Sequence, residues 1–154
     1  MLYIIFTVNI LAKLKTGPVI LIEDDVDDQE FIVETLQSIE VKNEILIFDN
    51  GNKAFEFLKA SKVQPFLILS DLNLPIMNGL QLKFQIEQDE DLKSRSIPFI
   101  FLTTSADNKS VKEAFDLNAQ GFFVKENTYD GIHKQLKQIV EYWKFCKHPN
   151  TKEA

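Results

Sequence analysis

Cysteine is nearly absent from the 154-residue sequence, and Cys146 alone cannot form a disulfide within the chain. A thiol without a partner cysteine is typical of a reducing compartment, so we expect a cytoplasmic protein. Basic residues are also in the minority, with 17 Lys and Arg against 23 Asp and Glu, and they are scattered along the sequence. Because nucleic-acid binding needs a clustered positive surface, the sequence argues against a nucleic-acid partner.

Long hydrophobic runs are absent as well. The apolar stretch within residues 1–14 is shorter than the roughly 20 residues of a membrane-spanning helix, and it lacks the basic start and cleavage site of a signal peptide. We expect residues 1–16 to form an N-terminal extension, either a strand or helix added to the domain or the product of an upstream start codon. A membrane-surface anchor is the alternative, although we predict no membrane partner.

No Gly/Ser-rich linker, internal repeat or low-complexity segment divides the sequence. Its length is enough for one domain with a hydrophobic core. We therefore assign residues 17–147 to a single domain and residues 148–154 to a short C-terminal tail, with His148 at the surface.

Short apolar runs alternate with amphipathic segments along this domain. The runs are rich in Ile, Val and Phe without alternating polarity, which predicts strands of a parallel sheet that are buried on both faces. They comprise residues 19–22, 45–48, 66–69, 99–102 and 122–124. Apolar residues at helical spacing predict helices over residues 26–39, 52–60, 79–88, 107–118 and 129–146. Five βα units predict a doubly wound, flavodoxin-like α/β fold with strand order 2-1-3-4-5.

Several helix starts carry recognisable signals. Asp27 and Asp28 lie in the first turn of helix 26–39, where the helix dipole favours acids. Asp107 is expected to be a first-turn acid or the cap of helix 107–118. Asn78 and Gly79 predict a turn into helix 79–88, in which glycine permits a positive φ.

Polar side chains follow four of the predicted strands at the point where each strand ends. Glu23 and Asp24 follow the first strand, Asp71 the third, Thr103 the fourth and Lys125 the fifth. Because parallel strands end on the same side of a sheet, and strands 1 and 3 are neighbours in this order, the acids should share one edge. Clustered carboxylates repel each other unless a cation binds, and oxygen ligands suit Mg²⁺.

This set of side chains suits phosphoryl transfer. Lys125 can pair with one phosphoryl oxygen, and Thr103 can donate a hydrogen bond to another. Asp71 is then free to accept the phosphoryl group as an acyl phosphate. The reaction needs mainly in-line positioning and charge neutralisation, which these residues supply.

With these residues in place, the sequence resembles the CheY-like response-regulator receiver domains of two-component signalling. The resemblance covers residues 18 to about 145 and depends on four motifs in the order and spacing of the family. They are IEDD at 22–25, DLNLPIMNG at 71–79, FLTT at 101–104 and FFVK at 122–125.

The resemblance implies a role for each acidic residue of the site. Asp71 corresponds to the phosphoacceptor, Asp24 to the acid that binds the metal directly, and Glu23 to its partner that acts through water. Asn73 corresponds to the position whose backbone carbonyl binds the metal. Asp25 is expected to open the loop or to cap the first helix.

The resemblance also assigns the signalling residues. Thr103 and Lys125 correspond to the signalling hydroxyl and the phosphate-pairing lysine, and Thr103, Thr104 and Phe122 to the switch. Thr104 is bulkier than the small residue common at its position, and Phe122 lacks a tyrosine hydroxyl, so its switching would be steric and hydrophobic. Glu126 follows Lys125 where the family usually has proline, often after a cis bond, so this loop is expected to differ in shape.

The implied function is that of a stand-alone signalling switch, not an enzyme, with autophosphatase activity at most. A histidine kinase or histidine phosphotransfer protein would phosphorylate it in the presence of Mg²⁺, and a partner protein or second copy would bind the face of residues 107–146. Two alternatives remain open: a pseudo-receiver that is never phosphorylated and, with less support, a haloacid-dehalogenase-type phosphatase. The phosphatase chemistry usually needs a second aspartate where this sequence has Asn73.

Overall fold

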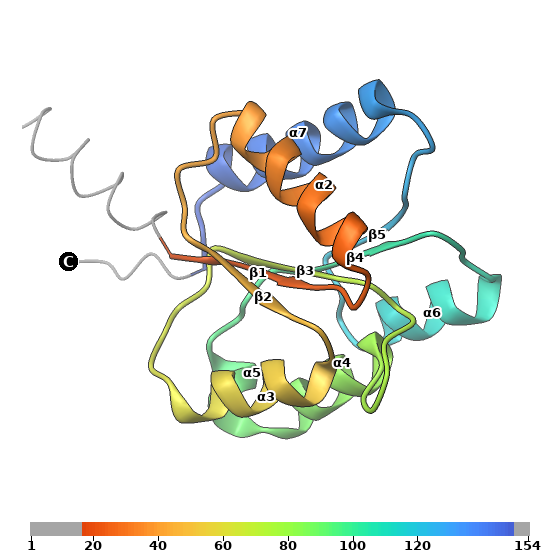
Figure 1. The fold of residues 1–154 in the computed structure, drawn as a ribbon. Coiled ribbons are helices and arrows are strands. Elements are labelled where there is room, and N and C mark those ends of the chain that lie inside the picture. Colours follow the sequence, from red (N-terminus) through yellow and green to blue (C-terminus); the bar gives the residue numbers. More distant parts are fainter. Residues whose placement is uncertain (1–16, 150–154) are drawn as a thin grey trace, which may run out of the picture.

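A parallel β-sheet forms the centre of the computed structural model, which describes residues 17–149 (Figure 1). Its strands are β1 (Val19–Ile22), β2 (Ile45–Phe48), β3 (Leu67–Ser70), β4 (Phe99–Thr103) and β5 (Gly121–Val124). They are hydrogen-bonded in the order β2-β1-β3-β4-β5, which confirms the predicted flavodoxin-like topology. The expectations for residues 1–16 and 150–154 lie outside the described residues.

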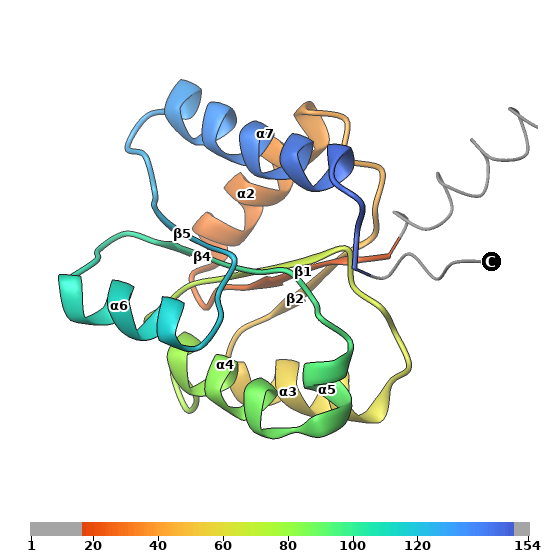
Figure 2. The same cartoon turned by 180° about the vertical axis from the view of Figure 1, so that it is seen from behind.

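Helices cover both faces of this sheet (Figures 1 and 2). One face carries α2 (Val26–Ser38) and α7 (Tyr129–Phe145). The other carries α3 (Gly51–Ala60), α4 (Gly79–Gln88), α5 (Glu90–Ser94) and α6 (Asn108–Asp116). The five predicted helices are present with small shifts of their ends. Helix α5 was not predicted, because a five-residue helix with one buried residue, Leu92, is too short to show a period.

Alternate residues of the central strands pack against opposite helical layers. Val19 and Leu21 of β1 contribute to the core under α2 and α7, and the residues between them contribute to the other core. The prediction that every strand is buried on both faces is wrong for β2 and β5, where Ile47 and Val124 are 43% and 48% exposed. These strands lie at the sheet edges, so each has a neighbouring strand on one side only.

The loops at the C-terminal edge of the sheet end in well-formed helix caps. Asp25 accepts a hydrogen bond from the backbone N–H of Asp28 at 3.0 Å and caps α2, and Asp107 caps α6, as predicted. Asn78 caps α4 through a reciprocal capping box. These caps anchor the starts of helices that border the site.

Gly79 is needed because the chain passes close to the backbone of Asp71 at this point, and not because its φ is positive. No glycine within residues 17–149 has a positive φ, so that expectation is wrong. A Cβ atom at Gly79 would lie 2.3 Å from the backbone oxygen of Asp71 and 2.9 Å from the Phe101 ring. Helix α4 therefore begins directly against the backbone of Asp71.

The end of the described chain packs back onto the domain. The Nε2 atom of His148 lies 2.5 Å from the backbone oxygen of Phe66, and the two rings are stacked with centroids 5.4 Å apart. The expectation of a surface His148 is therefore wrong, because its ring is buried against a residue 82 positions earlier in the sequence. Within the described part of the chain, no helix is both long and apolar enough to cross a lipid bilayer.

Candidate functional site

The ends of β1 and β3 bring three carboxylates together. Ile22 and Ser70 are register partners in these neighbouring strands, and the N–H of Asp71 donates to the carbonyl of Ile22 at 2.9 Å. The residues that follow both strands therefore lie at one edge of the sheet. Carboxylate oxygens of Glu23, Asp24 and Asp71 all lie within 4.8 Å of one another. Glu23 and Asp71 are buried whereas Asp24 is exposed, so the cluster is accessible from the side of Asp24.

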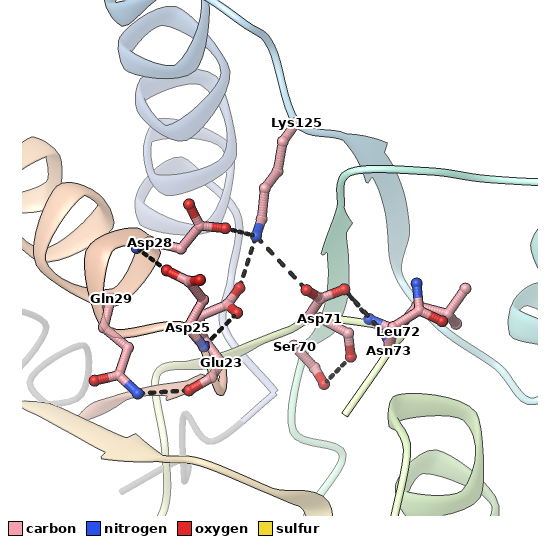
Figure 3. Close-up of polar contacts among 9 residues, drawn as sticks. All are labelled: Glu23, Asp25, Asp28, Gln29, Ser70, Asp71, Leu72, Asn73 and Lys125. Carbon is pink, nitrogen blue, oxygen red and sulfur yellow. Dashed lines mark hydrogen bonds and ion pairs between the residues drawn. The ribbon is translucent and has the colours of Figure 1, made fainter. Parts of the chain in front are cut away.

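The loop after β3 orients the carboxylate of Asp71. Its Oδ1 atom accepts hydrogen bonds from the backbone N–H groups of Leu72 at 2.5 Å and Asn73 at 3.2 Å. The N–H of Gly79 donates to the carbonyl of Leu72 at 3.0 Å, which closes this loop onto the start of α4. The second oxygen, Oδ2, faces Lys125 (Figure 3). One oxygen is thus held by the backbone, and the other is directed into the site.

Lys125 reaches from the end of β5 into the acidic cluster (Figure 3). Its Nζ atom donates to Glu23 Oε2 at 2.6 Å and to Asp28 Oδ2 at 2.7 Å. The distance from Nζ to Asp71 Oδ2 is 3.7 Å. The ammonium is therefore hydrogen-bonded to two carboxylates and only adjacent to the third.

Burial and pairing together set the charge of this cluster. Burial raises the pKa of the Glu23 carboxyl above its ordinary value, and the hydrogen bond from Lys125 only partly offsets this effect. Burial by itself would lower the pKa of Lys125, but hydrogen bonds to Asp28 and Glu23 outweigh it, so the pKa is raised. The site contains more carboxylates than this one ammonium can neutralise, which favours binding of a divalent cation.

A buried hydroxyl lies at the end of β4, the strand next to β3. Thr103 is fully buried, and its Oγ1 atom has no hydrogen-bond partner among residues 17–149. An unsatisfied buried group of this kind costs on the order of 1–3 kcal/mol, so it needs an explanation. The next residue, Thr104, is exposed, and on β5 the half-buried Phe122 packs on Phe101 with ring centroids 5.6 Å apart.

A family model described as the response regulator receiver domain matches residues 19–137. The chain belongs to this family. It is 30% identical over 130 residues to response regulator Rcp1 of Synechocystis sp., covering 81% of this chain and 87% of that protein. It is also 30% identical over 130 residues to chemotaxis protein CheY-3 of Vibrio cholerae, covering 84% of this chain and 97% of that protein.

Solved receiver structures have the same fold. The phosphorylated cyanobacterial phytochrome response regulator RcpA superimposes with a TM-score of 0.75 at 30% identity, covering 82% of this chain and 93% of that one. The Mn²⁺-bound form of Rcp1 superimposes with a TM-score of 0.74 at 29% identity, covering 90% and 99% of the two chains. Relatives of this receiver are response regulators and not classical enzymes.

The donor set of this receiver fits a divalent metal ion. Glu23, Asp24 and Asp71 offer only oxygen atoms, the ligands that hard cations such as Mg²⁺ prefer. Asn73 is an exposed residue of the loop after β3, and its backbone N–H donates to Asp71. The structure thus brings the predicted acids and Lys125 together, and Thr103 ends the strand beside them.

Two residues near Lys125 were not predicted. Asp28 contacts the ammonium, although the sequence marked it only as a first-turn acid. Gln135 of α7 binds the backbone on both sides of Lys125. Its Nε2 donates to the carbonyl of Val124 at 2.7 Å, and its Oε1 accepts from the N–H of Glu126 at 3.3 Å. A polar residue within the apolar stripe of α7 is the signal that could have revealed it. The Lys125–Glu126 bond is trans, since residues 17–149 contain no cis peptide.

Proposed function

We propose that this receiver is a phosphorylation-dependent switch whose phosphoacceptor is Asp71. The observation that carries the proposal is the meeting of a carboxylate, a buried ammonium and a partnerless hydroxyl at one sheet edge. These groups belong to Asp71, Lys125 and Thr103. The protein would catalyse only its own phosphorylation and, at most, its own dephosphorylation.

In this proposal the acidic cluster holds Mg²⁺. Asp24 and Asp71 would bind the ion directly, Glu23 through water, and Asn73 through its backbone carbonyl. The mutual approach of the three carboxylates within 4.8 Å supports this ligand set. A bound Mg²⁺ neutralises negative charge on the carboxylates and on the incoming phosphoryl oxygens.

The donor is a phosphohistidine of a histidine kinase or histidine phosphotransfer protein. Asp71 Oδ2 is the attacking oxygen, because the N–H groups of Leu72 and Asn73 occupy Oδ1. A bond forms between Oδ2 and phosphorus while the bond between phosphorus and the histidine nitrogen breaks. The departing imidazole nitrogen takes a proton from water, and an acyl phosphate remains on Asp71. Lys125 pairs with a phosphoryl oxygen and offsets its charge.

The new phosphoryl group adds about 1.5 to 2 negative charges at the sheet edge. Thr103 Oγ1 can donate a hydrogen bond to it and so gain the partner it otherwise lacks. Movement of Thr103 toward the phosphoryl group leaves room beside Thr104 into which Phe122 can turn from its half-buried position. The result is a population shift between two packings, which requires only a few kcal/mol of differential contact.

The output is a change in the surface built from residues 107–146. A downstream protein or a second copy of the chain would bind this surface in the cytoplasm, and we propose neither a nucleic-acid nor a membrane partner. The net charge of −6 and the scattered basic residues support the exclusion of nucleic acid.

Incubation with acetyl phosphate and Mg²⁺ tests the proposal. Intact-protein mass spectrometry should detect one added phosphoryl group on the wild type, none on Asp71→Asn, and none after chelation of the metal. Asp116→Asn, which removes an exposed carboxylate of α6, should be phosphorylated like the wild type. An unmodified wild type, or equal modification of Asp71→Asn, would contradict the proposal and favour a pseudo-receiver.

A further inference from the structure

Asp28 contacts Lys125 although it is not a member of the cluster formed by Glu23, Asp24 and Asp71. Its Oδ2 atom accepts a hydrogen bond from Lys125 Nζ at 2.7 Å, whereas Asp71 Oδ2 lies 3.7 Å from the same nitrogen. An ammonium has three N–H donors, and two of them are taken here by Asp28 and Glu23. The lysine is therefore held by carboxylates other than the proposed phosphoacceptor.

The position of Asp28 allows its carboxylate to compete with a phosphoryl group for the hydrogen bonds of the Lys125 ammonium. Asp28 belongs to the first turn of α2. Asp25 caps this turn, because its side chain accepts a hydrogen bond from the backbone N–H of Asp28 at 3.0 Å. It is not one of the three clustered metal-ligand candidates, so a bound metal need not alter its charge. Its carboxylate is 40% exposed, whereas that of Glu23 is 2% exposed and belongs to the cluster itself. Asp28 can thus act on Lys125 from the side away from Asp71 (Figure 3).

We infer that Asp28 is a positioning residue that restrains Lys125 and competes with a phosphoryl group on Asp71 for its ammonium. The inference rests on the proposed function. A phosphoryl group on Oδ2 would bring anionic oxygens next to Lys125 Nζ, and each N–H group that turns toward them from Asp28 weakens the bond to Asp28. The Asp28 charge also offsets the positive charge that attracts the phosphoryl oxygens. Asp28 therefore stabilises the unphosphorylated state.

Beryllofluoride, a phosphoryl analogue, tests the competition at equilibrium. Its affinity is measured by NMR titration of backbone amides at a Mg²⁺ concentration that saturates each variant. Asp28→Asn should bind beryllofluoride about fivefold more tightly than the wild type, equivalent to about 1 kcal/mol and the upper range for a pair with a partly exposed carboxylate. Asp28→Glu, which retains the carboxylate, should return the affinity toward the wild-type value.

The matched control is Asp27→Asn, because Asp27 is an acid of the same helical turn and forms no ion pair among residues 17–149. It should leave the affinity unchanged. Unchanged or weaker binding by Asp28→Asn, or equal tightening by Asp27→Asn, would overturn the inference while leaving the proposed function intact. The proposed function itself would fail if the wild type did not bind, or if Asp71→Asn bound equally well.

Discussion

Replacement of Lys125 by methionine tests how strongly the site depends on its ammonium. Methionine keeps much of the apolar stem but removes the charge that contacts Glu23 at 2.6 Å and Asp28 at 2.7 Å. Removing one partner of a buried ion pair costs about 3–5 kcal/mol, which applies to Glu23 because its side chain is 2% exposed. The pair with Asp28 adds at most about 1 kcal/mol, because that carboxylate is 40% exposed. Since Lys125 no longer has to be desolvated, we expect a net loss of about 3 kcal/mol at neutral pH.

This loss should depend on pH through Glu23. Burial already raises the pKa of Glu23 with Lys125 present, and loss of the ammonium should raise it further. A carboxyl whose pKa is higher in the native than in the unfolded state binds more protons in the native state. Its destabilising effect is therefore complete above the native pKa and disappears below the unfolded pKa. The difference between Lys125→Met and the wild type should shrink when the pH falls from about 8 to about 5.

Urea denaturation followed by circular dichroism at both pH values measures the effect. Lys53→Met is the control, because Lys53 pairs with Asp49 at a similar 2.8 Å, but the two side chains are 59% and 52% exposed. This substitution should leave the free energy of unfolding nearly unchanged at either pH, because water screens an exposed pair. A loss for Lys125→Met below about 1 kcal/mol, or one independent of pH, would refute the assigned importance of the buried pair.

Two further substitutions test features of the same edge. Thr103→Val should raise the free energy of unfolding by about 1 kcal/mol, because it removes a buried hydroxyl that has no partner. The same substitution should abolish the proposed response to phosphorylation. Thr35→Val should instead lower it by about 1 kcal/mol in the same denaturation assay, since the buried Thr35 hydroxyl donates to a helix carbonyl at 2.7 Å; equal effects would contradict this reasoning. Gly79→Ala should cost about 1–3 kcal/mol and slow phosphorylation by acetyl phosphate, because its Cβ would meet the Asp71 carbonyl. Gly121→Ala should cost less, since the nearest atom is the movable end of a side-chain ring at 3.0 Å, and an equal cost would argue against a backbone clash.

Much of the fold followed from local patterns. Unbroken apolar runs predicted the strands, and the right-handed connection of five βα units predicted their order, because chirality restricts how parallel strands can be joined. The meeting of Asp24 with Asp71 followed from that order, since both residues follow the ends of neighbouring parallel strands. Asp25 and Asp107 were predicted as caps because capping depends on residues only a few positions away.

Tertiary structure decided which groups touch. Asp28 and Lys125 are 97 residues apart, and they meet only because the start of α2 and the residue after β5 come to the same edge of the sheet. Gly79 was predicted to permit a positive φ in a turn, but the structure needs it because the backbone of Asp71 leaves no room there for a Cβ atom. His148 read as part of a tail, but its ring covers Phe66. Sequence alone determined which residues reach the edge of the sheet, because strand direction and period are local properties. Hydrogen-bond partners and the space around each side chain arise only when distant segments pack together.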